Sequence, residues 1–147
     1  EGIFLHAEGM DDEYSAMDNW LISGRTEMMV EVKVRENYTA ERVDSFGGQM
    51  LESKKLIRMR RWFDDRYEAM NDACPFHNAM LYDLPVFYFI FFQDRLRIYE
   101  LDMDPRSYKW VNESYQKDNY NKDVKINKWV TYLDDSRIIE EIKYKKQ

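Results

Sequence analysis

The stretch YSAMDNWLISGRTEMMVEVKVR, residues 14–35, decides the fold. In its second half, Glu27 to Arg35, apolar and mainly charged side chains alternate, which indicates a half-buried strand with a β-branched apolar face. Residues 15–22 form a second expected strand, and the turn residues 23–26 predict an antiparallel hairpin. The two faces of the second strand are Met28, Val30, Val32 and Val34, and Met29, Glu31, Lys33 and Arg35.

The segments after this hairpin predict an α/β domain. A long helix is expected from near Val43 to the region 67–70, although Gly47-Gly48 weakens its beginning. A second hairpin is expected at 86–92 and 96–101, and its first strand is apolar on both faces, as in a central strand covered on each side. The helix has a candidate apolar stripe of Leu51, Leu56, Ile57, Met59 and Phe63.

The remaining segments predict short peripheral elements. They are a short helix at 105–111, a loop-rich stretch at 117–128, an edge strand at 129–133, and a last helix capped by residues 134–136 and ending near Tyr144. The chain of 147 residues fits one domain, 1–147, with its core at about 14–101 and the peripheral elements at 102–147.

Composition and charge restrict the class of protein. With 44% hydrophobic and 34% charged residues, the chain is not of the disordered type. No apolar run approaches the roughly 20 residues that span a bilayer, so no membrane partner is expected. The single Cys74 excludes an internal disulfide framework, and the N-terminus has no basic region typical of a signal peptide. A cytoplasmic, intracellular protein is expected. Its net charge of −6 means that binding to nucleic acid would need a local basic patch.

Three residues of the hairpin form a candidate catalytic site. Glu31 and Lys33 lie two apart in a strand, so their side chains emerge on the same face. Asp18, on the preceding strand, is placed to meet Glu31 across the hairpin. Two carboxylates can hold Mg²⁺ or Mn²⁺ through oxygen ligands. The metal polarises a phosphoryl group, and a neighbouring ammonium stabilises the developing negative charge.

The tripeptide Glu-x-Lys alone has little weight, because it occurs three times: at Glu31, Glu52 and Glu141. Alternating charge is common on solvated faces. A purely structural protein, in which Glu31 and Lys33 merely form a cross-strand salt bridge, is therefore an open alternative.

Residues 14–22, the turn, and the strand carrying Glu31-Val32-Lys33 resemble the core of the PD-(D/E)XK nuclease superfamily. The resemblance covers about residues 14–101. It implies a restriction-endonuclease-like core, with a central mixed β-sheet flanked by helices. It also implies that Asp18 and Glu31 bind Mg²⁺ or Mn²⁺ together with the backbone carbonyl of Val32, and that Lys33 is catalytic. Gln49, expected early in the following helix, matches a Gln that approaches the active site in some branches.

The function that the resemblance implies is metal-dependent hydrolysis of DNA phosphodiester bonds, in phage or mobile-element DNA processing, restriction or repair. A basic helix face formed by Lys54, Arg58 and Arg61 is the candidate phosphate-binding patch. A homodimer is a possible assembly for cutting both strands. The alternative is a catalytically inactive, nuclease-like module that binds nucleic acid or a protein.

Overall fold

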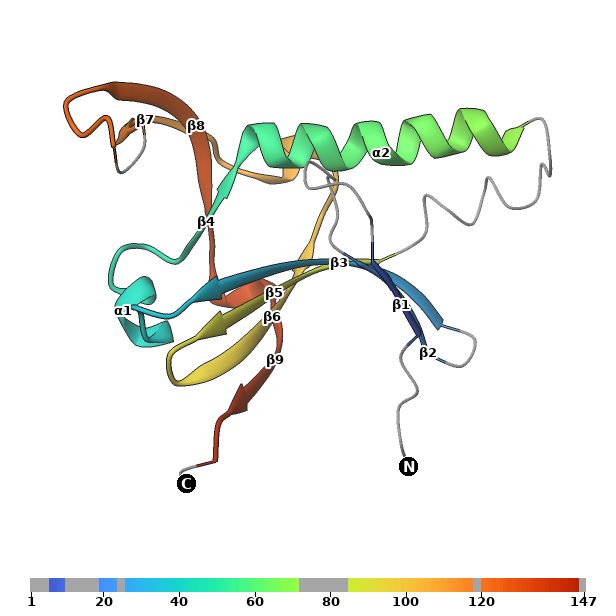
Figure 1. The fold of residues 1–147 in the computed structure, drawn as a ribbon, viewed down its shortest axis with the longest axis horizontal. Coiled ribbons are helices and arrows are strands. Elements are labelled where there is room, and N and C mark those ends of the chain that lie inside the picture. Colours follow the sequence, from blue (N-terminus) through green and yellow to red (C-terminus); the bar gives the residue numbers. More distant parts are fainter. Residues whose placement is uncertain (1–5, 10–18, 24–25, 72–84, 118–119, 146–147) are drawn as a thin grey trace.

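A long strand, β3 (Thr26–Arg35), lies inside a six-stranded mixed sheet (Figure 1). The computed structural model describes residues 6–9, 19–23, 26–71, 85–117 and 120–145. The strand order is β1-β2-β3-β5-β6-β9, and β3 is antiparallel to β2 but parallel to β5. The mixed sheet confirms the α/β class. The other strands are β1 (His6–Gly9), β2 (Asn19–Ser23), β5 (Val86–Phe92), β6 (Arg95–Leu101) and β9 (Ile138–Lys143).

Both expected hairpins are present. In the first, the register runs from Ser23 opposite Thr26 to Asn19 opposite Val30. The part of the predicted strand before Asn19 lies outside the described residues. In the second, β5 and β6 pair antiparallel, and β5 is a central strand, as predicted. Strand β1, which the sequence analysis did not predict, pairs with β2 at the edge of the sheet.

The connection from β3 to β5 contains α1 (Ala40–Asp44), β4 (Gln49–Glu52) and α2 (Ser53–Asn71). Helix α2 lies along one side of the main sheet (Figure 1). The expected helix start near Val43 was wrong because Gly47 and Gly48 have φ angles of +103° and +115°. Glycine adopts these angles readily, whereas they are incompatible with a right-handed helix. The chain therefore leaves α1, forms β4, and only then enters α2.

Strand β4 belongs to a second, three-stranded sheet of order β4-β8-β7, with β7 at Val111–Gln116 and β8 at Lys125–Leu133. Two predictions were wrong here. Strand β8 begins inside the expected loop, and it is the central strand of its sheet rather than an edge strand. β8 pairs on both sides, with β4 and with β7, which explains its length.

The expected last helix was also wrong. Asp134 caps only a three-residue turn, η2 (Asp135–Arg137), by accepting a hydrogen bond from the Ser136 N–H at 2.9 Å. The next residues, Ile138–Lys143, pair with β6 as strand β9. The open edge of β6 supplies hydrogen-bond partners that a local propensity cannot anticipate. Of the expected helix at 105–111, only a short turn, η1 (Pro105–Ser107), is formed.

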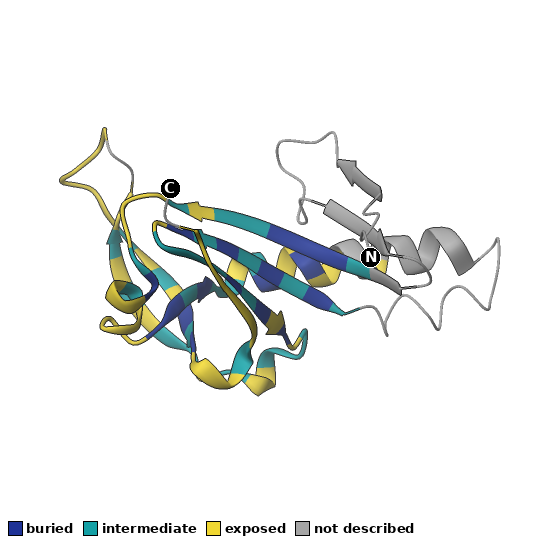
Figure 2. Ribbon diagram, turned by 90° about the horizontal axis from the view of Figure 1, so that it is seen from below, coloured by how far each residue is buried: buried dark blue, intermediate teal, exposed yellow. Residues whose placement is uncertain are grey.

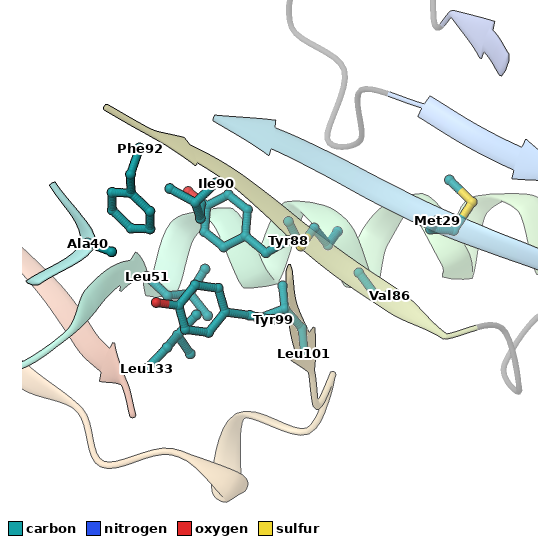
Figure 3. Packing of buried hydrophobic residues seen from close by; sticks show 11 residues of the cluster. Met29, Ala40, Leu51, Val86, Tyr88, Ile90, Phe92, Tyr99, Leu101 and Leu133 are labelled. Carbon is teal, nitrogen blue, oxygen red and sulfur yellow. The ribbon is translucent and has the colours of Figure 1, made fainter. Parts of the chain in front are cut away.

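The core is formed between the main sheet, β4 and the first turns of α2 (Figure 3). Alternate residues of β5 are buried and the others half-buried, so its second face is less covered than predicted. Buried and half-buried residues follow the long strands of the main sheet (Figure 2). Within the expected helical stripe, Leu56 and Met59 are buried, Leu51 is buried on β4, and Ile57 is exposed. The cluster comprises Met29, Ala40, Leu51, Met59, Val86, Tyr88, Ile90, Phe92, Tyr99, Leu101 and Leu133.

The residues after 101 are integrated into the fold rather than peripheral. Leu133 of β8 is 1% exposed within the core, and β9 extends the main sheet. In the described part of the chain, no helix is both long and apolar enough to cross a membrane.

A buried arginine on β6 connects α1 with the last two strands of the main sheet, β6 and β9. Arg97 on β6 is 5% exposed. Its guanidinium donates to both carboxylate oxygens of Asp44 at 2.6 and 2.8 Å, and its Nε donates to Glu141 of β9 at 3.1 Å. Such a fork-like pair is geometrically specific, and a lysine cannot reproduce it.

Gly48→Ala should strongly destabilise the fold. A Cβ at this position would lie 2.4 Å from the Leu133 carbonyl oxygen, and the backbone has a positive φ. We expect a loss of about 2–4 kcal/mol in the free energy of unfolding, measured by urea denaturation. Gly47→Ala is the control: it has the same backbone strain, but its Cβ would meet only the Tyr132 ring at 3.9 Å. Equal losses in both variants would contradict the proposed clash.

Arg97→Met should lower the free energy of unfolding by about 2–3 kcal/mol, because it removes the counter-charge of Asp44, whereas Glu141 keeps its ion pair with Arg95. Arg106→Met is the matched control. Arg106 also binds a carboxylate, that of Asp104, but its side chain is 90% exposed, so no measurable change is expected. A loss in the control as large as that in Arg97→Met would refute the role of burial.

Candidate functional site

A pocket of about 370 Å³ lies among β3, β4, β5 and the beginning of α2. Four of its lining residues are cationic and two are carboxylates, so the lining is net positive although the whole chain carries −6. This local excess is the kind of basic patch that binding to phosphate requires. The lining residues are Glu31, Val32, Lys33, Met50, Leu51, Glu52, Lys54, Lys55, Arg58 and Tyr88.

Glu31 is a largely buried carboxylate of this pocket. It is 8% exposed and lies opposite Tyr88 of β5 in the parallel register. The face of β3 that carries Glu31 also carries Met29, which belongs to the core cluster, whereas on the other face Val30 is buried and Val34 is 58% exposed. A buried carboxylate needs a counter-charge. Lys55 of α2 provides one, with its Nζ 2.5 Å from Glu31 Oε1.

Lys33 lines the same pocket, two residues farther along β3. Burial lowers the pKa of its ammonium group below 10.5, because the charged form loses its water, and the positive charge of Arg35 lowers the pKa further. The carboxylates of Glu52 and Glu31 act in the opposite direction. Lys33 is thus a partly desolvated cation in a pocket that also contains the carboxylates of Glu31 and Glu52.

Glu52 was missed by the sequence analysis, although it belongs to the second of the three Glu-x-Lys tripeptides. Both Glu52, on β4, and Lys54, on α2, line the pocket. Lys128 of β8 forms an ion pair with Glu52, with Nζ 2.7 Å from Oε1. Exposure alternates along Gln49–Glu52 in the structure, but the sequence Gln-Met-Leu-Glu does not alternate between polar and apolar residues, so Gly47-Gly48 is the sequence feature that marks a break before this tripeptide.

The predicted phosphate-binding residues lie on α2, but only two of them reach the pocket. Lys54 and Arg58 line it, one helical turn apart. Arg61 is exposed on the same helix and is not among the described residues that line the pocket. Lys55, which was not among the three predicted residues, forms an ion pair with Glu31 at the predicted centre.

Gln49 does not occupy the expected position. It is the first residue of β4 rather than an early residue of the helix, and it is 1% exposed. Its side-chain amide donates a hydrogen bond to the Met50 carbonyl at 2.9 Å. It is not among the described residues that line the pocket, because the two preceding glycines redirect the chain before α2 begins.

Asp18, the predicted second carboxylate, lies outside the described residues, so its approach to Glu31 stays a prediction. The described pairing of β2 with β3 begins with Asn19 opposite Val30, the residue before Glu31. Val32, whose carbonyl is a further predicted ligand, lines the pocket.

The pocket offers a small set of hard oxygen donors. Within the described ranges, no three Asp, Glu, His or Cys side chains gather as a metal-binding group. Glu31 and the Val32 backbone are nevertheless of the type that Mg²⁺ and Mn²⁺ prefer, and the close ammonium of Lys55 shows that Glu31 accepts a cation at this place. A metal at this position would be held by Glu31 and Val32, with the predicted Asp18.

No protein-family model matches the chain, and comparisons with curated proteins and with solved structures found no match either. Functional inference for this chain therefore rests on its own residues.

Lys33→Met should make the folded protein more stable. The substitution removes a desolvated ammonium and keeps most of the side-chain volume, so we expect a gain of about 1 kcal/mol in the free energy of unfolding at pH 7. The pKa of Lys33 is lower in the folded state than its ordinary 10.5. The gain should therefore be full at neutral pH and disappear as the pH rises towards 10.5, where both states lose the proton.

Urea denaturation at several pH values measures this effect. Lys143→Met is the control, because Lys143 belongs to a Glu-x-Lys tripeptide on β9 but is exposed. A Lys33→Met variant that is less stable than the wild type at pH 7 would show that Lys33 is held by favourable contacts.

Proposed function

We propose that the chain is a metal-dependent nuclease that hydrolyses DNA phosphodiester bonds, with Mg²⁺ or Mn²⁺ held by Glu31, Val32 and Asp18. The observation that carries this proposal is the pocket in which Glu31 and Lys33 lie beside the basic start of α2. Glu31 supplies a metal-binding carboxylate, Lys33 a catalytic ammonium, and Lys54 and Arg58 supply phosphate-binding cations. All of these groups are within one cavity of about 370 Å³.

The order of elements supports the resemblance to PD-(D/E)XK nucleases. An antiparallel hairpin carries the motif on β3, α2 follows, and β5 returns parallel to β3. We assign the restriction-endonuclease-like core to β1, β2, β3, α2 and β5. Helix α2 would then be one of the flanking helices.

We assign one role to each of these groups. When bound, the metal polarises the phosphoryl group and activates water. Glu31 accepts the cation on the core side of β3. Lys33, with its lowered pKa, holds the attacking water and stabilises negative charge as it develops on the phosphate. Lys54 and Arg58 bind neighbouring phosphates of the same strand, and Arg61 extends this contact along the exposed side of α2.

DNA is the proposed substrate, following the resemblance, in phage or mobile-element DNA processing, restriction or repair. A homodimer would place two such pockets on one duplex.

One observation favours the alternative of an inactive, nuclease-like module. The ion pair of Lys55 with Glu31 neutralises the carboxylate without any metal. In a protein that only binds nucleic acid, this pair would be permanent. The other three cations of the pocket, Lys33, Lys54 and Arg58, would then serve binding alone.

Cleavage assays with Mg²⁺ or Mn²⁺ on single-stranded, duplex and branched DNA test the proposal. We expect wild-type protein to cut at least one of these substrates, and Lys33→Met, Glu31→Gln and Asp18→Asn each to lose at least about a hundredfold in rate. Lys143→Met, which alters a Glu-x-Lys tripeptide outside the pocket, should cut at the wild-type rate.

If the wild type cuts none of these substrates, the catalytic proposal is wrong. DNA binding that persists in that case, and that is weakened by Arg58→Met, would identify the inactive module. Full activity of Lys33→Met would exclude the assigned mechanism even if the protein is a nuclease.

A further inference from the structure

The contact between Glu31 and Lys55 joins the strand that carries the motif to the helix that covers it. Glu31 Oε1 and Lys55 Nζ are 2.5 Å apart, and both residues line the pocket. The side chain of Glu31 is 11% exposed and that of Lys55 is 28% exposed. The carboxylate is therefore fixed within the fold, while the ammonium reaches it from the solvent side.

Glu31 Oε2 is buried, so Oε1, which Lys55 contacts, is the oxygen that a cation entering from the pocket would meet. Oxygen ligands of divalent cations lie roughly 2.0–2.6 Å from the metal, which is the range in which Lys55 Nζ already lies from Glu31 Oε1. Two cations at this separation from one oxygen repel each other strongly in a partly desolvated pocket. Lys55 must therefore withdraw when a metal binds Glu31.

When Lys55 withdraws from Glu31, its ammonium can bind a phosphate of the proposed substrate. It lies on α2 beside Lys54 and one turn before Arg58, and all three line the pocket. Its four-carbon side chain is flexible, and its ammonium can exchange one oxygen partner for another. A phosphate held by Lys54 and Arg58 offers such an oxygen.

We propose that Lys55 is a further functional residue of this site, which occupies the cation position at Glu31 until a divalent metal displaces it and then binds the substrate phosphate. This inference rests on the proposed function, because it takes Glu31 as a metal ligand. Under this proposal, the ion pair between Lys55 and Glu31 is the metal-free state of an active site and not a sign of inactivity.

Direct Mn²⁺ binding at pH 8, followed by the electron paramagnetic resonance signal of the free ion, separates the two roles of Lys55. Lys55→Met removes the competing cation, so we expect Mn²⁺ to bind about tenfold more tightly than to the wild type. Lys143→Met is the control. Lys143 is exposed on β9 and is not among the described residues that line the pocket, so we expect the Mn²⁺ affinity of this variant to equal that of the wild type.

The second measurement is binding of a fluorescein-labelled DNA duplex with Ca²⁺ in place of Mg²⁺, followed by fluorescence anisotropy. Lys55→Met should bind this duplex more weakly than the wild type, although its metal affinity is higher. Opposite changes in the two affinities are the signature of one side chain that serves both ligands. A purely structural lysine would not produce them.

Lys55→Arg keeps a positive charge opposite Glu31 and tests whether a folding defect explains the result. It should bind Mn²⁺ no more tightly than the wild type, and its thermal melting temperature should be similar. If Lys55→Met and the wild type bind Mn²⁺ equally, the displacement proposal is overturned while the nuclease proposal stands. If the wild type and all variants fail to bind Mn²⁺, both proposals are wrong.

Discussion

Parallel pairing of β3 with β5 is the constraint on which the rest of the structure depends. Parallel strands cannot be joined by a tight turn, so the chain must cross over the sheet between them. In this protein the crossover contains α1, β4 and α2. It brings Glu52, Lys54 and Lys55 to the face of β3 that carries Glu31 and Lys33. The pocket is thus a direct consequence of how two strands of one sheet are connected.

Local patterns in the sequence predicted the elements whose structure is determined locally. The alternation in β3 and the turn residues before it gave the first hairpin, and the apolar run of β5 gave the central strand of the second. Strands β4 and β9 were missed, because each is short and depends on a partner far away in the chain: β8 for one and β6 for the other. For β4, the sequence feature that marked a break was Gly47-Gly48, and this pair of glycines was interpreted as a weak start of the helix.

For the candidate site, too, the sequence predicted what depends on local structure and not what depends on tertiary packing. A period of two places Glu31 and Lys33 on one face without any knowledge of the fold. That this face is directed toward α2 rather than toward solvent depends on tertiary packing, as does the meeting of Glu31 with Lys55. Glu52 was set aside because its tripeptide looks like an ordinary charged surface. Charge pattern alone cannot distinguish such a surface from a pocket wall contributed by another sheet.

Helix α2 starts at Ser53 immediately after β4 ends at Glu52, without any intervening loop. No loop that could act as a hinge therefore separates the three-stranded sheet from the helix. Lys128 of β8 stabilises this junction through its ion pair with Glu52. Because Lys54 and Lys55 follow Glu52 closely in the chain, the pairing of β4 with β8 also fixes where these two lysines enter the pocket.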